Sequence, residues 1–270
     1  MSDREKTVNG LVIRAVDSGE HDRLITLLTP GGSLTVSAKG ARSLKNRNMP
    51  ACRPFVFGNY EIASRGSASW LRDASVTESF PRIGKSISAI YLATYFCEVM
   101  DELSEPGTEA GELLSLGLNS LYALDRGLCP EAQIKAVFEI RAAVLSGYMP
   151  ELSACRICGR LPDGLDYLDV MNGGLLCPDC AATQPKLPPD APPGAVPADA
   201  LGTRSILMPL SDGALAAFRY SAGADPKRIF SFTLSEGRDM KYFARAAETY
   251  LLSHLERGFP ALKYYYEVSQ

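Results

Sequence analysis

Histidine is scarce in this chain of 270 residues, which contains only His21 and His254, far apart in the sequence. Several motifs are missing altogether: the GxxxxGK[ST] loop of nucleotide hydrolases, the GxGxxG turn of dinucleotide-binding proteins, the GxSxG turn of serine hydrolases and the HExxH motif of zinc proteases. The sequence therefore lacks the signatures of these enzyme classes. We interpret His21, which Asp22 follows, as part of a solvated turn, and His254 as a residue of the surface or of the core edge.

Long apolar runs are also absent. No stretch approaches the roughly 18 uninterrupted apolar residues of a membrane span, and the N-terminal "MSDREKTVNG" has no apolar segment typical of a secretion signal. Hydrophobic residues nonetheless make up 46% of the chain and charged residues 22%, which is enough for a substantial core. We expect a folded cytoplasmic protein, more naturally of two domains than of one.

Acidic residues are missing from one stretch of a chain whose net charge is −3. Residues 1–80 contain 11 lysines and arginines against 8 acids, whereas the remainder contains 17 against 23. A solubilising loop usually mixes both signs, so a stretch with basic residues only is a candidate for phosphate contacts with a nucleic acid. No acid lies between residues 23 and 60, where the basic residues are Arg23, Lys39, Arg42, Lys45, Arg47 and Arg53.

The first 80 residues have the short apolar period of strands. The segments "TVNGLVIRAVD", "RLITLLT", "SLTVSAK", "FVFGNYEIAS" and "SWLRDASVTES" are separated by glycine-containing turns and a basic loop, and they predict a small antiparallel barrel. Gly31 and Gly32 after Pro30 predict a tight hairpin. Barrels of this size often bind single strands through aromatic rings beside a charged groove. About half of the available rings should belong to the core; they are Phe55, Phe57, Tyr60 and Trp70.

Beyond about residue 80 the apolar period becomes helical. Residues 87–103, "EAGELLSLGLNSLYALDRG" and "PEAQIKAVFEIRAAVLSGY" predict three helices with short connections, and hence a compact bundle. Six prolines between Gln184 and Ala200 predict an extended connector without regular structure. After it, "SDGALAAFRY" and "SEGRDMKYFARAAETYLLSHLERG" begin with serines suited to helix N-caps, and these helices should return to the bundle.

Four of the seven cysteines form two CxxC pairs with the spacing C-x2-C-x18-C-x2-C. Each pair offers two thiolates on one turn, so two pairs complete the tetrahedral shell of a structural zinc ion. Four thiolates leave no position open for water or substrate, which argues against catalysis. The alternative is an unmetallated or redox-active pair of turns. The predicted ligands are Cys155, Cys158, Cys177 and Cys180, while Cys52, Cys97 and Cys129 are interpreted as packing residues.

Several motifs follow one another in a fixed order: "TVNGLVIRAVDSGEHDRLITLLTPGGSLTVSAKGARS", "RPF", "AVFEIRAAVLSGYMPELSACRICG", "GGLLCPDC" and "LSHLERGFPALKYYYE". In this order, over nearly the full length, the chain resembles the RecO family of bacterial recombination mediators. The resemblance implies an α+β protein with an N-terminal OB-fold β-barrel for DNA binding over residues 1–80. A helical domain would follow over residues 81–152 and 204–270, interrupted by a zinc-binding insertion over 153–184 and the proline-rich connector over 185–203.

The resemblance also implies a function without catalysis. Such a protein binds single- and double-stranded DNA at the nucleoid, anneals complementary strands, works with RecR, engages the acidic C-terminal tail of single-stranded-DNA-binding protein and helps to load RecA. The family's "AKGAR" motif falls on Lys39 and Arg42, and its zinc cysteines fall on the two CxxC pairs. Arg53 stands where the family often has glutamine and is a hypothetical additional phosphate contact. Lys135 and Arg141 on the third helix are candidates to bind the acidic tail.

Two alternatives from other classes stay open. A zinc-dependent hydrolase or transferase requires an open zinc position beside a carboxylate or histidine. A zinc-ribbon scaffold without a DNA role predicts that Lys39 and Arg42 can be replaced without consequence for DNA. A mediator predicts salt-sensitive binding, because five neutralised phosphates on a single strand give a slope of about −3.5 in log K against log salt.

Overall fold

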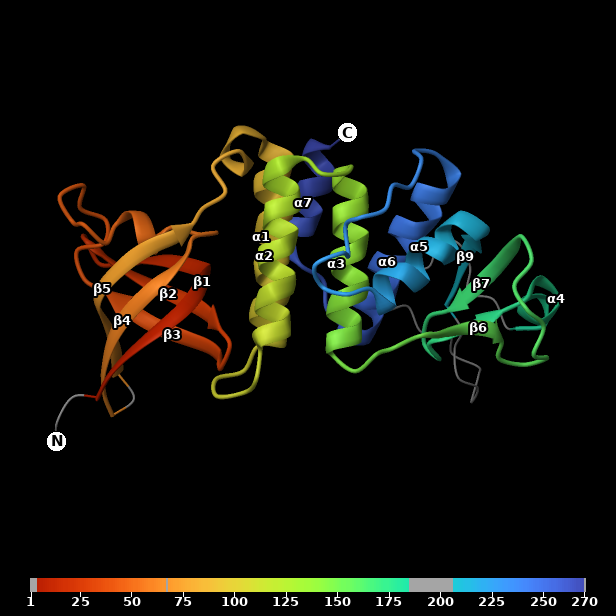
Figure 1. Cartoon of the computed structure of the whole chain (residues 1–270), viewed down its shortest axis with the longest axis horizontal. Helices are drawn as coiled ribbons and strands as arrows, with labels where there is room; N and C mark the ends of the chain where they lie inside the picture. Colours follow the sequence, from red (N-terminus) through yellow and green to blue (C-terminus); the bar gives the residue numbers. More distant parts are fainter. Residues whose placement is uncertain (1–3, 67, 185–205, 270) are drawn as a thin grey trace. The chain divides into compact units, whose positions relative to one another are not determined.

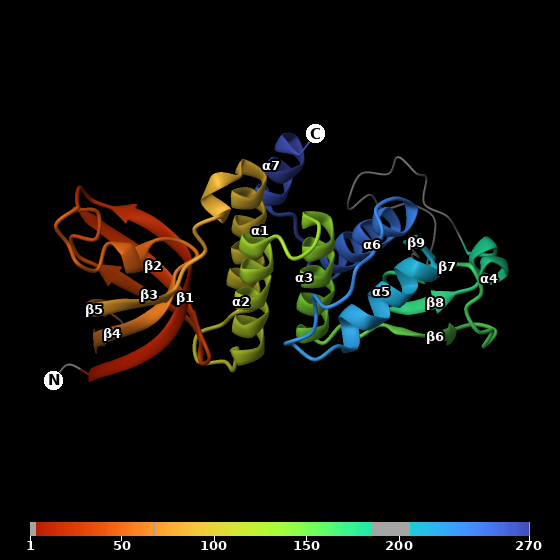
Figure 2. The ribbon, with the colours of Figure 1, turned by 45° about the horizontal axis from the view of Figure 1, so that its top comes forward.

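The computed structural model describes residues 4–66, 68–184 and 206–269, which form two compact units (Figures 1 and 2). One unit comprises Met1–Gly127 with Phe259–Gln270, and the other comprises Leu128–Gly258. The domain boundaries expected from the sequence, with a break near residue 80, do not coincide with these two units. They stay a prediction about function. The expected connector at 185–203 lies outside the described residues. None of the described helices combines the length and the apolarity that crossing a bilayer requires.

The first unit begins with a closed five-stranded barrel, coloured red to orange in Figure 1. Its strand order is β1-β2-β3-β5-β4, in which β1 pairs with both β2 and β4, and β3 meets β5 in the parallel direction. This arrangement confirms the predicted OB-fold barrel. The strands are β1 (Arg4–Ser18), β2 (Asp22–Thr29), β3 (Gly32–Ala38), β4 (Phe57–Arg65) and β5 (Ala68–Glu78).

The β2–β3 hairpin confirms the predicted tight turn, because Thr29 pairs with Gly32. Gly32 has a φ of +92°, and a Cβ at this position would collide with the backbone carbonyl of Glu105. A short 3-10 helix, η1 (Pro50–Cys52), contributes the buried residues Ala51 and Cys52 to the core of the barrel. The interior of the barrel is filled by inward-facing apolar side chains, among them Val12, Ile25, Leu27, Val36, Tyr60 and Ile62.

Three helices complete this unit: α1 (Ile87–Leu103), α2 (Gly111–Arg126) and α7 (Pro260–Val268), with a second 3-10 helix, η2 (Ile83–Lys85), before α1. Ser86 caps α1 by accepting a hydrogen bond from the backbone N–H of Ala89. Gly117 lies against Met100 and Leu11, where any side chain would clash with the sulfur of Met100. Sequence periodicity did not predict α7 as a separate helix; it begins with Pro260 and packs on α1, and the Ala261 N–H donates to Glu98.

The second unit contains α3 (Glu131–Leu145), α4 (Pro178–Ala182), α5 (Asp212–Gly223) and α6 (Arg238–Leu255). α3 packs against α5 and α6, in agreement with the expectation that the helices after the connector return to the bundle. The prediction of a serine cap for α6 was wrong, because Gly237 is its N-cap residue. Ser211 is the N-cap residue of α5, as predicted, but its hydroxyl donates to Asp239 and makes no capping hydrogen bond.

A four-stranded sheet accompanies these helices, with the order β6-β8-β7-β9. Its strands are β6 (Glu151–Cys155), β7 (Leu165–Asp169), β8 (Gly174–Leu176) and β9 (Leu207–Ser211). This sheet was not expected from the sequence. β9 follows residues 185–205 in the chain and pairs antiparallel with β7, so the segment around the cysteines is part of a sheet rather than an independent loop.

Candidate nucleic-acid interface and metal site

The loop between β3 and β4 carries most of the predicted DNA contacts and is held by its own hydrogen bonds. The Gly40 N–H donates to the Asp22 carboxylate over 2.7 Å. The Asn46 side-chain amide donates to the Lys39 carbonyl over 3.0 Å, and two backbone hydrogen bonds close successive turns at Ser43 and Asn46. The basic side chains therefore project from an ordered backbone.

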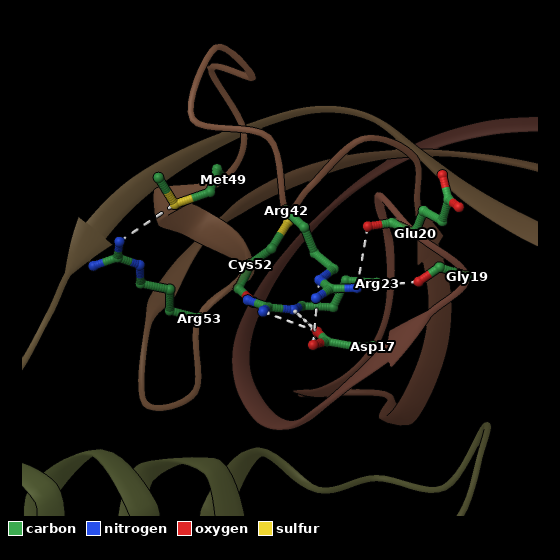
Figure 3. A network of polar contacts seen from close by, with 8 residues as sticks. All are labelled: Asp17, Gly19, Glu20, Arg23, Arg42, Met49, Cys52 and Arg53. Carbon is green, nitrogen blue, oxygen red and sulfur yellow. Dashed lines mark hydrogen bonds and ion pairs between the residues drawn. The ribbon is translucent and has the colours of Figure 1, made fainter.

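Three basic side chains of this loop are exposed and form no ion pair within the described residues: Lys39, Lys45 and Arg53. The Arg53 guanidinium lies 3.4 Å from the sulfur of Met49, as Figure 3 shows. A sulfur atom is only a weak acceptor. These three cations are thus available to an external anion.

Acids from neighbouring strands approach the other predicted contacts. The Arg47 guanidinium lies 3.1 Å from the Asp73 carboxylate of β5 and remains 77% exposed. Arg23 and Arg42 both contact the carboxylate of Asp17, at the end of β1 (Figure 3). The expectation of a stretch without acids holds along the chain but not in space, because strand pairing brings Asp17 and Asp73 to it.

The aromatic rings of the barrel divide between core and surface. Tyr60 is fully buried, and its hydroxyl donates to the Ala51 carbonyl over 2.8 Å. Burial raises the pKa of this hydroxyl, with a smaller contribution from Cys52. Tyr60 therefore belongs to the core and offers no face to a base, whereas Phe55, Phe57 and Trp70 are half-buried.

The four predicted metal ligands come together in the second unit. All four Sγ atoms lie within 4.8 Å of one another, and those of Cys158 and Cys177 are 3.7 Å apart. Cys155 ends β6, Cys177 is the N-cap residue of α4, and Cys180 lies within α4. Cys155 and Cys177 are buried, and the cluster contacts apolar side chains, including Leu176.

The local backbone prepares this cluster for a cation. Burial opposes ionisation of Cys155, but hydrogen bonds from backbone N–H groups of Cys158, Cys177 and Ile157 outweigh it and lower the pKa of this thiol to about 6. Hydrogen bonds with the other thiols, Cys177 first, together with burial raise the pKa of Cys180 to about 12. Four thiolates at this spacing require a cation to offset their mutual repulsion, and their soft donors suit a tetrahedral metal ion. The cluster can therefore hold a metal ion, with no ligand position left for a substrate.

The remaining cysteines lie in surroundings that suppress their reactivity. Burial raises the pKa of the Cys52 thiol to about 11, with Arg23 opposing the shift, and raises that of Cys129 to about 11. Burial also raises the pKa of Cys97, aided by Asp101 and Glu98. A thiol that stays protonated is a poor nucleophile, and these three thiols lie outside the four-cysteine cluster, which agrees with the interpretation of these residues as packing residues.

The two histidines belong to different units. His21 is exposed in the turn after β1. The ring of His254 stacks on that of Tyr148 at 4.2 Å and meets Tyr250 edge-on, and burial lowers its pKa. Neither histidine belongs to the cysteine cluster.

Lys135 and Arg141, the residues expected to bind an acidic partner, have different environments. Lys135 is 2% exposed, and its ammonium lies 2.8 Å from Glu139 and 2.6 Å from Glu248. Its charge is thus used inside the unit, which corrects the expectation of a surface contact. Arg141 is half-buried and donates to the Ala222 carbonyl over 2.7 Å.

Comparisons with known proteins agree with this architecture. Two family models match, one described as Recombination protein O N terminal over residues 1–80 and one as Recombination protein O C terminal over residues 84–195. A DNA repair protein RecO of Anaeromyxobacter dehalogenans (strain 2CP-1) is 34% identical over 270 residues, covering 98% of this chain and 97% of the relative. The DNA repair protein RecO of Acetivibrio thermocellus is 26% identical over 257 residues, covering 95% and 94%.

Proposed function

The chain belongs to the RecO family, and from that premise we propose that it is a DNA-binding recombination mediator without catalytic activity. Membership of this family supports a role in DNA repair and recombination. The observation that carries the proposal is the ordered loop of the OB-fold barrel, on which Lys39, Lys45 and Arg53 have no acidic partner among the described residues. Because the loop backbone is already ordered, binding of phosphates does not have to order it, and only the side chains lose rotamer freedom.

The mechanism proposed is charge neutralisation. Each phosphate that a lysine or arginine contacts releases condensed counterions, which favours binding of single- and double-stranded DNA irrespective of sequence. Neutralising the phosphates of two complementary strands also lowers the repulsion between them, so the same loop would promote annealing. This mechanism requires neither ATP nor an active-site acid. The exposed Arg47 adds a further contact, since an exposed ion pair such as that with Asp73 is weak.

The partners follow from the family and are part of the proposal: RecR, the acidic C-terminal tail of single-stranded-DNA-binding protein and, indirectly, RecA. Because Lys135 is buried between carboxylates, we restrict the proposed contact with the acidic tail to Arg141, which keeps part of its surface exposed. The place of action would be the cytoplasm, at the nucleoid.

For the four-cysteine cluster we propose a structural Zn2+ ion. Zinc favours four soft ligands in a tetrahedral arrangement, and the cluster offers four Sγ atoms from two turns of the chain. A bound ion would fasten β6 to α4 and so stabilise the sheet that carries them. DNA contact is assigned to the barrel instead.

The test is fluorescence-anisotropy binding of a labelled oligothymidine over a salt series. The variant Lys39→Ala/Lys45→Ala should flatten the slope of log K against log salt by about 1.4 and weaken binding about 25-fold at 0.1 M salt, since each phosphate contact on a single strand contributes about 0.7. The matched control is Lys227→Ala/Lys241→Ala, which removes two exposed lysines from the other unit. Equal losses in the two variants, or native binding that does not respond to salt, would refute the proposal.

A further inference from the structure

Asp17 contacts both arginines at one edge of the basic surface, and this contact has a defined geometry (Figure 3). Asp17 and Arg23 are directly opposite each other in the β1–β2 pairing. One carboxylate oxygen, Oδ1, accepts hydrogen bonds from Nε and Nη2 of Arg23 at 3.1 Å and 3.0 Å. The other oxygen, Oδ2, lies 3.2 Å from Nε of Arg42. A single carboxylate thus joins a strand and the loop that follows β3.

The two arginines differ in what remains available. Every guanidinium nitrogen of Arg23 has an acceptor, because Nη1 donates to the Cys52 carbonyl over 3.4 Å. In Arg42, Nη1 donates to the carbonyls of Gly19 and Glu20, both at 3.1 Å, while no contact involves Nη2 within the described residues. The Arg42 side chain is 36% exposed and that of Asp17 is 49% exposed, so solvent anions can reach both.

Two arginines that converge on the oxygens of one anion form the arrangement with which proteins bind phosphate. In this structure a carboxylate of the chain itself occupies that position. Resting on the proposed DNA-binding function, we propose that Asp17 is a built-in competitor for DNA phosphate. It occupies the anion site of Arg23 and Arg42 and holds the net charge of the three residues at plus one. A DNA phosphate could contact both arginines only by displacing the Asp17 carboxylate.

The direct test is the variant Asp17→Asn in the salt-series assay with labelled oligothymidine. The amide keeps the shape of the side chain and removes its charge, so one more phosphate contact becomes available. We expect the slope to steepen by about 0.7 and binding to tighten about fivefold at 0.1 M salt. In this variant Arg42→Ala should cost more affinity than it costs in the native chain.

The matched control is Glu20→Gln, which removes the same charge from the same turn. The backbone carbonyl of Glu20 accepts from Arg42, but its carboxylate makes no contact with either arginine. If Asp17→Asn tightens binding no more than Glu20→Gln does, the effect is one of overall charge and the proposal is refuted. If Asp17→Asn weakens binding, Asp17 serves to position the arginines, which also overturns the proposal. Because exposed ion pairs contribute little to folding, the Asp17 variants should stay folded. Asp17→Thr, whose side chain suits a strand, is a second uncharged variant for the same assay.

A second measurement does not depend on DNA. Inorganic phosphate is titrated into the native protein and the Asp17→Asn variant while the Nε–H resonances of the arginines are followed by NMR. Resonances of Arg23 and Arg42 should shift at lower phosphate concentration in the variant, and equal titrations would refute the proposal. If the native chain binds no DNA while the phosphate titrations differ, the DNA-binding function fails, and Asp17 competes with free phosphate for the two arginines but not with DNA.

Discussion

The buried position of Lys135 predicts a large loss of stability in the variant Lys135→Met. The change keeps most of the side-chain volume but removes the ammonium that contacts two carboxylates: that of Glu139, which is fully buried, and that of Glu248, whose side chain is 25% exposed. Removing one partner from a buried ion pair costs about 3–5 kcal/mol. For a unit of this size, that loss corresponds to a decrease in melting temperature of roughly 10–20 °C.

Two further variants test this reasoning by urea unfolding and thermal melting. Lys263→Met removes another lysine that pairs with a glutamate one helical turn away, but that pair is exposed, with 78% of the Lys263 side chain accessible. It should lower the free energy of unfolding by no more than about 0.5 kcal/mol. Adding Glu139→Leu and Glu248→Gln to Lys135→Met should restore much of the loss. A loss below about 1 kcal/mol for Lys135→Met alone would show that its charge is not structural.

Two other perturbations have defined outcomes. The double variant Cys177→Ser/Cys180→Ser, or treatment with a strong chelator, should lower the melting temperature and release bound metal, which a metal analysis checks. The salt slope of DNA binding in the anisotropy assay should stay unchanged. Loss of DNA binding at native stability would contradict a structural role of the metal. Burial lowers the pKa of His254 in the folded state, so the unfolded chain binds more protons and stability falls as pH decreases through about 6.5. Urea unfolding at pH 7.5 and 5.5 should therefore show a smaller loss for His254→Gln than for the native chain, and equal losses would exclude this linkage.

Local sequence signals predicted the barrel and the metal ligands because both depend on short-range patterns. Alternation along "FVFGNYEI" separates Val56, Gly58 and Tyr60 from their neighbours on the other side of the strand, and the structure buries these three residues. The spacing within each CxxC pair determines that two thiols share one turn. The four sulfurs therefore lie together as predicted.

Contacts between distant segments could not be predicted in the same way. Asp17 and Asp73 lie outside the acid-free stretch, and only the pairing of β1 and β5 with their neighbours brings them to its arginines. Lys135 has the polarity of a surface residue, but its carboxylate partner Glu248 comes from a helix more than a hundred positions later. The sheet of the second unit also depends on β9, which joins it from beyond residues 185–205.

We propose that DNA contacts the basic loop of the barrel and not the cysteine cluster. Lysine footprinting of the intact protein distinguishes the two: an amine-reactive reagent is applied with and without a saturating oligonucleotide, and modification is quantified by mass spectrometry. We expect protection of Lys39 and Lys45, with unchanged modification of the exposed Lys227 and Lys241 in the other unit. Protection of Lys227 and Lys241 with continued modification of Lys39 and Lys45 at saturation would exclude the basic loop as the DNA contact.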